Sequence, residues 1–255
     1  MSSLCWKIKA KDEDANIVVT PSDALVTDVN EFKRIVASAL EFTASDKRIV
    51  TLGIKPTRPE TGYGYIAAGD VAEKEICEVE SFREKPSLAV AEEYLAAGNY
   101  LWNAGIFVWN VKTIVDSICA FVPDLAEKMD QMAMSFYTGQ EAEVVGKIFP
   151  TCDKISIDYA VMEKADYIYT VPGNFGWSDV GTWGSLWTLL PHDEAGNAVI
   201  GENVHLYGCS GCIVHAPNAA SVVLEGLKDS IVVERDGRIL MCRMSEEQRI
   251  KDFTK

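Results

Sequence analysis

The 255-residue sequence lacks any apolar run long enough to cross a bilayer, and its start lacks the basic and apolar segments of a secretory signal. Positive charge is also scarce, because 24 Lys and Arg stand against 38 Asp and Glu, for a formal net charge of −14. No basic stripe is present, and an acidic chain would repel nucleic acid phosphates. These absences predict a cytoplasmic protein that has neither a membrane nor a nucleic acid as its partner.

Seven cysteines are spread along the chain, an odd and sparse set that does not form the disulfide framework of a small secreted protein. We therefore expect reduced thiols. His205, Cys209, Cys212 and His215 are of types that bind zinc, but their spacing matches no familiar finger. Packing of small apolar cysteines is the favoured interpretation.

Apolar β-branched runs alternate with helical patterns up to Pro191. The runs 17–20, 49–54 and 105–109 predict buried strands of the parallel type. Helices are expected over 28–45, where Asp28 and Glu31 resemble a capping box, and over 87–97, 111–136 with a break at Pro123, and 180–190; residues 1–13 form a short helix or a lead-in. The alternation predicts an α/β domain over residues 1–191, built on a largely parallel sheet.

The sequence changes texture after Pro191. Brief apolar runs at 198–200, 212–214, 221–224, 231–233 and 239–241 are separated by Gly, Asn and Asp, and no helix is expected among them. Their spacing of roughly ten residues suits an all-β unit or a few rungs of a β-solenoid. We place a domain boundary at Pro191-His192 and a β-rich unit over 192–255.

Two aspartates stand in loops where a ligand could bind. Asp23 follows the strand expected at 17–20, at the edge where open α/β sheets bind ligands. Asp179 lies in a glycine-rich loop, at about the N-cap of the helix expected over 180–190. Either one could merely cap a turn, but together they could share one hard cation that neutralises phosphate.

Three further segments carry side chains suited to a phosphorylated sugar. The glycines of loop 57–66 permit close backbone approach and Arg58 could meet a phosphate, or the loop could be a structural turn that leads into a strand. Glu84 and Lys85 could serve hydroxyls and a phosphate, although such neighbours are commonly a solvated surface pair. Asn103 could donate to and accept from hydroxyls, or could be a turn residue.

In order along the chain, these segments resemble the bacterial mannose-1-phosphate guanylyltransferases, a sugar nucleotidyltransferase family. The matching segments are Pro21-Ser22-Asp23, 51–66, Glu84-Lys85-Pro86, 101–105, 156–164 and 175–181. The resemblance runs from Ile17 to Leu190, and the tail resembles the start of that family's short left-handed β-helix. It implies a Rossmann-like nucleotidyltransferase sheet followed by a small β-helix-like unit.

The resemblance implies transfer of GMP from GTP to mannose 1-phosphate, which gives GDP-mannose and pyrophosphate. It further implies roles for six residues. Asp23 and Asp179 would hold Mg²⁺ and act in catalysis with Lys85, which would grip the sugar phosphate; Gly64 would touch the sugar through its backbone, Glu84 would bind its hydroxyls, and Asn103 would orient it. Asp158 and Glu163 match a family motif without an implied role; from the residues alone, Glu163 is as readily structural as functional.

One family feature has no counterpart here. Members begin with a strand that leads into a Gly-Gly-x-Gly-Thr-Arg-Leu-x-Pro-Leu loop for the nucleotide phosphates, and nothing before Ile17 matches it. We therefore expect an incomplete sheet over 1–191, impaired transfer, and self-association into a homo-oligomer that hides the exposed sheet edge. A non-catalytic sugar-phosphate-binding or assembly module, or an enzyme for another sugar 1-phosphate, are the alternatives.

Overall fold

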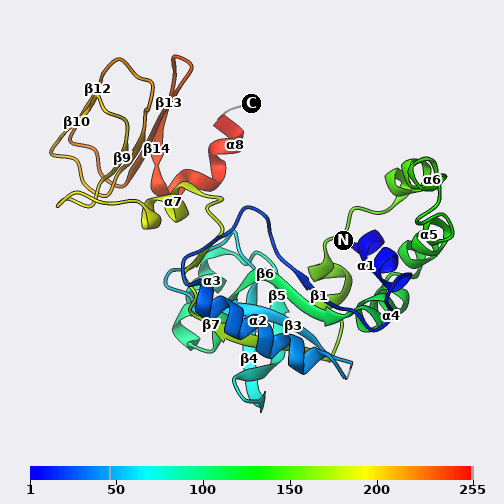
Figure 1. Ribbon diagram of the computed structural model, residues 1–255. Coiled ribbons are helices and arrows are strands. Elements are labelled where there is room, and N and C mark those ends of the chain that lie inside the picture. The colour runs from blue at the N-terminus through cyan, green and yellow to red at the C-terminus, as the bar shows by residue number, and fades with distance from the viewer. Residues whose placement is uncertain (46, 254–255) are drawn as a thin grey trace. The chain divides into compact units, whose positions relative to one another are not determined.

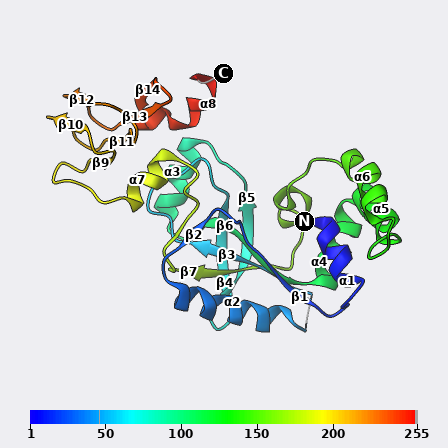
Figure 2. The same cartoon turned by 45° about the horizontal axis from the view of Figure 1, so that its top comes forward.

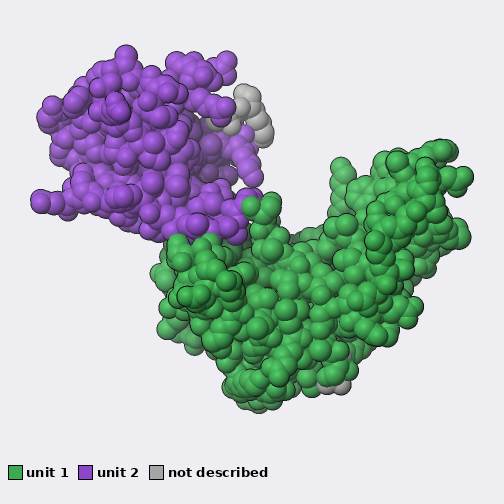
Figure 3. Space-filling model, viewed as in Figure 1, with its two compact units in different colours: residues 1–22, 26–177 green, residues 23–25, 178–255 purple. Residues whose placement is uncertain are grey.

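The computed structural model describes residues 1–45 and 47–253 and consists of two compact units, which are coloured separately in Figure 3. Unit 1 comprises Met1–Ser22 and Val26–Trp177. Unit 2 comprises Asp23–Leu25 and Ser178–Lys255, of which Thr254 and Lys255 lie outside the described residues. No described helix is long and apolar enough to span a bilayer.

Unit 1 contains a six-stranded sheet (Figure 1). Its order is β1 (Asn16–Val19), β6 (Tyr100–Asn110), β3 (Ile49–Ile54), β7 (Ile168–Gly173), β5 (Ile76–Arg83) and β4 (Tyr65–Glu73). The predicted α/β class is confirmed, but the prediction of a largely parallel sheet is wrong. Among the described strands of this sheet, β3 and β7 form the one parallel pair. The strand sequences are apolar because helices cover both faces of the sheet. Burial on both faces does not determine whether neighbouring strands run parallel or antiparallel.

Helix α2 (Val29–Thr43) covers one face of this sheet, as Figures 1 and 2 show. The helix begins where predicted, because the Asp28 carboxylate accepts a hydrogen bond from the Glu31 amide at 3.0 Å. Its buried residues, Ile35, Ala39 and Phe42, share a core with strand residues Val50, Leu52, Ile106 and Val108.

Helices α1 (Ser2–Lys9), α4 (Val111–Phe121) and α5 (Pro123–Ala133) pack together with the opposite face. Their core joins Trp6, Ile114 and Met129 to the sheet residues Ile49 and Trp109. The break at Pro123 is confirmed, since proline stands at the first turn of α5, where its missing N–H costs nothing. Helix α6 (Glu141–Ile148), a 3₁₀ turn (Phe149–Thr151) and a π-helical turn (Asp158–Met162) follow.

Helix α3 (Leu88–Ala97) ends at Gly98, as predicted, in the left-handed conformation. Ser87 occupies the N-cap position, but its side chain makes no capping hydrogen bond. Short strands β2 (Leu25–Val26) and β8 (Trp177–Ser178) form a separate two-stranded sheet.

Unit 2 is dominated by short strands. Parallel pairs join β9 (Ala198–Ile200) to β11 (Ile213–His215), β11 to β13 (Ser230–Arg235), and β10 (Val204–Tyr207) to β12 (Val222–Glu225); β14 (Arg238–Arg243) is antiparallel to β13. Helix α7 (Trp183–Leu189) is grouped with these strands because Trp183, Leu186 and Trp187 pack on their core. The expectation of no helix after Pro191 is wrong, since a 3₁₀ helix (Met244–Arg249) and α8 (Ile250–Phe253) end the unit.

Candidate functional site

The structure brings four of the six predicted site residues together in unit 1. The Asn103 amide donates to the Gly64 carbonyl at 2.8 Å, and a Cβ added at Gly64 would lie 2.6 Å from the Glu84 carboxylate and 3.4 Å from Asn103 Cβ. Lys85 Nζ lies 3.6 Å from Glu84 Oε1. We call Gly64, Glu84, Lys85 and Asn103 the Asn103 cluster. Gly64 has to be glycine for the Glu84 carboxylate to sit against the backbone.

A bulge in β6 sets the direction of the Asn103 side chain. The register between β3 and β6 shifts between Thr51, opposite Phe107, and Gly53, opposite Asn103. Gly105 takes up the extra length with a φ of +68°, a conformation that favours glycine. Bulges of this kind re-aim a side chain and recur beside functional sites.

Two residues join the cluster that sequence analysis missed or left without a role. Thr51 Oγ1 donates to Asn103 Oδ1 at 2.9 Å, and Asn103 Nδ2 donates to Asp158 Oδ1 at 3.2 Å. Thr51 lies within an apolar strand run, where it reads as an ordinary β-branched residue. The signal available in the sequence was a hydroxyl-bearing residue inside a strand whose other side chains are apolar.

Two carboxyl groups of the cluster, those of Glu84 and Asp158, have a raised pKa. Burial, and then the charge of Asp158, raise the pKa of Glu84, while Lys85 opposes the rise; the side chain of Glu84 is only 14% exposed. Burial likewise raises the pKa of Asp158, against hydrogen bonds that stabilise its charged form. Glu163 is exposed and adds a smaller repulsion that raises the pKa of Glu84. The cluster is therefore an acceptor-rich surface with one cation at its rim.

Arg58 pairs with a neighbouring carboxylate, which agrees with the alternative that this loop is a structural turn. Its guanidinium pairs with the buried Glu60 carboxylate at 3.1 Å and lies 5.3 Å from the Trp102 ring centroid. Glu60 also accepts from the Gly62 amide at 3.0 Å. Arg58 and Glu60 thus hold the loop before Gly64 in shape.

The two predicted metal ligands belong to unit 2. Asp23 is exposed, and Asp179 is half-buried. Asp179 is not the N-cap of α7: the Thr182 hydroxyl accepts from the Ser185 amide at 3.0 Å, because a threonine nearer the helix outcompetes it. Asp179 Oδ1 instead accepts from Ser185 Oγ at 2.9 Å.

The backbone beside Asp179 is held in an unusual conformation. Val180 has a φ of +44°, which is rare for a β-branched residue and costs on the order of 1–3 kcal/mol.

The carboxylates of Asp23 and Asp179 are ligands of the type that Mg²⁺ binds in enzymes, where water and phosphate fill its remaining positions. The described residues contain no group of three or more His, Cys, Asp or Glu that could form a closed metal cage.

The histidine and cysteine array does not form a metal site in the described residues. Cys209 Sγ lies 3.6 Å from the carbonyl oxygens of Tyr207 and Leu224, and Cys212 Sγ lies 3.4 Å from that of Ser210. Both thiols are buried, and all seven cysteines are free. The interpretation as packed, reduced cysteines agrees with these contacts.

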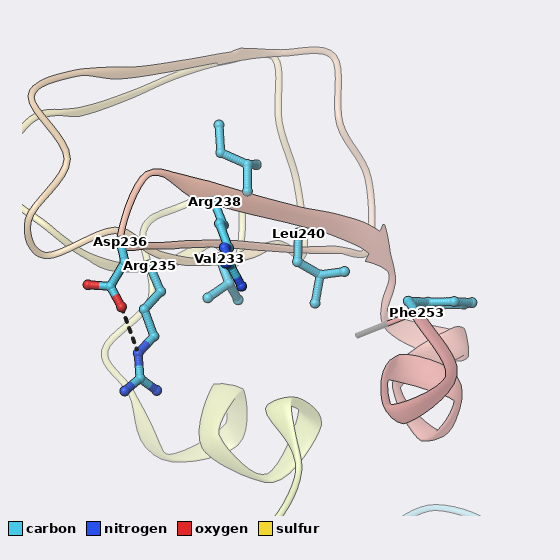
Figure 4. A pocket seen from close by; sticks show the side chains of 7 residues that line it. Val233, Arg235, Asp236, Arg238, Leu240 and Phe253 are labelled. Carbon is cyan, nitrogen blue, oxygen red and sulfur yellow. Dashed lines mark ion pairs between the residues drawn. The ribbon is translucent and has the colours of Figure 1, made fainter. Parts of the chain in front are cut away.

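The described pockets do not coincide with the Asn103 cluster. One of about 740 Å³ lies on the β13–β14 hairpin, where Arg235 pairs with Asp236 at 3.7 Å and both side chains are almost fully exposed (Figure 4). It contains none of the predicted site residues. Another of about 350 Å³ reaches Asp158 and is otherwise mainly apolar, with Phe107 and Ile118 in its wall.

Comparison with known proteins places the chain in a family. Residues 2–196 match the model of the nucleotidyl transferase family, so the chain belongs to that family. It is 32% identical to a mannose-1-phosphate guanylyltransferase of Escherichia coli, with 99% of this chain and 55% of the relative covered. It is 34% identical to the alginate biosynthesis protein AlgA of Pseudomonas aeruginosa, with 98% and 52% covered.

A solved structure agrees with the same grouping. The crystal structure named as a mannose-1-phosphate geranyltransferase from Thermus thermophilus superposes with a TM-score of 0.83 at 32% identity, and the match covers 98% of this chain and 72% of that one. The resemblance to mannose-1-phosphate guanylyltransferases is thereby confirmed. The chain spans about half the length of the curated relatives that it matches.

Proposed function

We propose that the protein transfers GMP from GTP to mannose 1-phosphate, giving GDP-mannose and pyrophosphate. The observation that carries the proposal is the Asn103 cluster, in which a carboxylate, a carboxamide, a close-packed glycine and a lysine converge inside a nucleotidyl transferase fold. Such a set offers acceptors and donors to sugar hydroxyls and a cation to a phosphate. The names of the relatives favour mannose 1-phosphate as the acceptor.

In the proposed reaction an oxygen of the sugar phosphate attacks the α-phosphorus of GTP. A new P–O bond forms to the sugar phosphate, and the bond to the β-phosphate oxygen breaks, so that the electron pair leaves with pyrophosphate. Glu84 and Asn103 would orient the sugar, and Lys85 would hold its phosphate. The protein's contribution is then positioning and charge neutralisation.

Asp23 and Asp179 would hold a Mg²⁺ ion in this proposal. Their carboxylates suit a hard cation, and the Ser185 hydroxyl fixes one oxygen of Asp179. The ion would neutralise the phosphates during transfer.

The rate of GMP transfer should rise when a glycine-rich loop is supplied. The printed sequence has no Gly-Gly-x-Gly-Thr-Arg segment, the family feature that would hold the GTP phosphates, so we propose that turnover is reduced without one. The decisive assay measures pyrophosphate release from GTP, mannose 1-phosphate and Mg²⁺, for this chain and for a version joined to such a loop. No transfer by either version would refute the proposed reaction, and equal transfer by both would refute the need for the loop.

The same assay separates the alternatives. Glucose 1-phosphate is offered in competition with mannose 1-phosphate, and UTP in competition with GTP. Preferential use of either competitor would show that the enzyme acts on a different sugar or base. Calorimetry could show that the chain binds mannose 1-phosphate although neither version transfers GMP. That result would favour a non-catalytic sugar-phosphate module, with the Asn103 cluster of unit 1 as its binding site.

The proposal includes three further features, which concern the fold of unit 2, the oligomeric state and the location in the cell. The parallel register of β9, β11 and β13 supports a left-handed β-helix in unit 2. Among the described strands β1 pairs with β6 alone, and its free outer edge supports a homo-oligomer, which light scattering would test. A location in the cytoplasm is the third part of the proposal, and cell fractionation would test it.

Substitution of Lys85 by methionine should weaken substrate binding without unfolding the protein. We expect Lys85→Met to raise KM for mannose 1-phosphate by about tenfold, because one charge-assisted contact is worth roughly 1.5 kcal/mol. The Lys85 side chain is 63% exposed, so its ion pair contributes little to stability. Initial rates and a thermal melt measure both effects, with Lys85→Arg as the control that keeps the charge. An unchanged KM would remove Lys85 from the site.

A further inference from the structure

The hydrogen bonds around Asn103 fix the orientation of its carboxamide. The Gly105 amide can only donate, so the atom that faces it at 3.0 Å has to be the carbonyl oxygen. The Thr51 hydroxyl donates to the same oxygen at 2.9 Å, so both of its lone pairs are used. The nitrogen then faces Asp158, whose carboxylate can only accept when ionised.

This arrangement leaves Asn103 with one polar function for a ligand. One N–H of Nδ2 is directed to Asp158 at 3.2 Å. For the second N–H, no partner is recorded in the part of the chain that the structure describes, while the oxygen is saturated by two donors. Contrary to the sequence interpretation, Asn103 can therefore donate to a sugar but cannot also accept from it.

The partners of Asn103 come from separate elements. Thr51 is fully buried in β3, Gly105 lies in the bulge of β6, and Asp158 is the first residue of the π-helical turn. A side chain held from three directions loses little further entropy when a ligand binds, which favours affinity.

We propose that Asp158 is a positioning residue for the sugar site. Together with Thr51, it locks the Asn103 carboxamide so that its remaining N–H is a dedicated donor to an oxygen lone pair of the sugar. Glu84, beside it, is an acceptor, so the site would engage one sugar oxygen as an acceptor and one sugar hydroxyl as a donor. This inference rests on the proposed function for the identity of the ligand.

The rival role for Asp158 is direct contact with the sugar. Its Oδ1 already accepts from Asn103, and the Ser156 side chain helps to stabilise the charged form of its carboxylate by lowering its pKa. These interactions favour the positioning role, and the two roles predict different behaviour of the isosteric amide. Asp158→Asn keeps an oxygen that can accept from Asn103, but it loses the charge.

A ligand-free experiment tests the lock itself. Nuclear magnetic resonance of the ¹⁵N-labelled full chain should show the Asn103 side-chain N–H groups exchanging with water about tenfold faster in Asp158→Ala, because one hydrogen bond of roughly 1.4 kcal/mol is lost. Asp158→Asn should restore slow exchange. Thr51→Val should speed exchange as well, and Thr51→Ser should restore it. Unchanged exchange in both Asp158→Ala and Thr51→Val would overturn the proposal.

A binding experiment then tests the consequence for the sugar. Calorimetry with mannose 1-phosphate should give a Kd about tenfold higher for Asp158→Ala than for the unchanged chain, and one within about threefold for Asp158→Asn. Asp166→Ala, which removes an exposed carboxylate nearby in the sequence, is the matched control and should bind normally. Equal weakening by Asp158→Ala and Asp158→Asn would assign Asp158 to direct contact and overturn the positioning role.

Failure of the two proposals can be told apart. If the unchanged chain does not bind mannose 1-phosphate, the sugar assignment fails, while the exchange measurements still decide whether Asn103 is locked. If the unchanged chain binds and Asp158→Ala binds equally well, the positioning role fails alone. A thermal melt of each variant shows whether it is folded, and should Asp158→Ala not fold, Thr51→Val against Thr51→Ser carries the same comparison.

Discussion

Glu84→Gln is expected to yield a more stable protein that is about 100-fold less active. The activity falls because the carboxylate is the strongest acceptor offered to the sugar hydroxyls, and a hydrogen bond to a charged group is worth up to about 3 kcal/mol. The stability rises because burial and the charge of Asp158 raise the pKa of Glu84, so its ionised form is disfavoured in the folded state. Stability and function thus pull this residue in opposite directions.

The pH dependence of that gain follows from the direction of the shift. An acid whose pKa is raised by folding destabilises the fold once it is ionised, so the destabilising contribution of Glu84 alone disappears as pH falls through its folded pKa. The advantage of Glu84→Gln should therefore be present at neutral pH and absent below the unfolded pKa, where Glu84 is protonated in both states. Thermal melts across this range measure the advantage, and kcat/KM measures the loss of activity.

Glu92→Gln provides the matched control, because it makes the same chemical change at an exposed position of α3. It should change neither the melting temperature nor kcat/KM by a measurable amount. A Glu84→Gln variant that melts below the unchanged protein at neutral pH, or that keeps full activity, would show that Glu84 is a structural ion-pair partner of Lys85 and not a ligand for the sugar.

Local signals in the sequence were enough for most helices of unit 1. Asp28, Pro123 and Gly98 each mark a helix end through chemistry that acts within a few residues, and each marks the end that the structure shows. At Asp179 the same reasoning placed a cap three residues too early, because Thr182 competes for the position. When two good N-cap residues stand within a few positions of each other, the sequence alone does not determine which of them begins the helix.

The direction of the strands could not be read in the same way. An apolar run such as 105–109 reports burial on both faces, which helices can provide for an antiparallel strand as well. The motifs in the sequence singled out the residues of the Asn103 cluster, but they did not predict the hydrogen bonds that fix the Asn103 side chain. Thr51 and Asp158 lie 52 and 55 residues from Asn103, and such pairings depend on the sheet register and the bulge.

Gly176→Ala is expected to cost about 3 kcal/mol of unfolding free energy, the largest loss of stability that we predict. Gly176 has a φ of +63°, where alanine is strained by roughly 1–2 kcal/mol, and its new Cβ would lie 1.8 Å from Thr27 Oγ1 and 3.1 Å from Thr27 Cβ. The Thr27 side chain therefore has to move. Chemical denaturation of the two proteins measures the difference.

Gly98→Ala separates the two contributions to this loss. Gly98 has a φ of +79° and nothing within 4 Å of an added Cβ, so this variant should lose only the roughly 1 kcal/mol of backbone strain. Removing the hydroxyl with Thr27→Ala in the Gly176→Ala background should recover about half of the additional loss. Equal costs at Gly98 and Gly176 would mean that Thr27 gives way freely.

Gly176→Ala should also disturb the proposed metal ligands, Asp23 and Asp179. The Thr27 amide donates to the Gly176 carbonyl at 3.3 Å and the Asp28 amide to the Phe175 carbonyl at 3.0 Å, so these bonds tie the segment after Asp23 to the segment before Asp179. Pushing Thr27 away strains both bonds, and we expect Gly176→Ala to require more Mg²⁺ for half-maximal transfer. Gly98→Ala, which disturbs neither segment, should keep the Mg²⁺ requirement of the unchanged protein. A Gly176→Ala variant that is folded and shows the same requirement would separate this contact from the metal site.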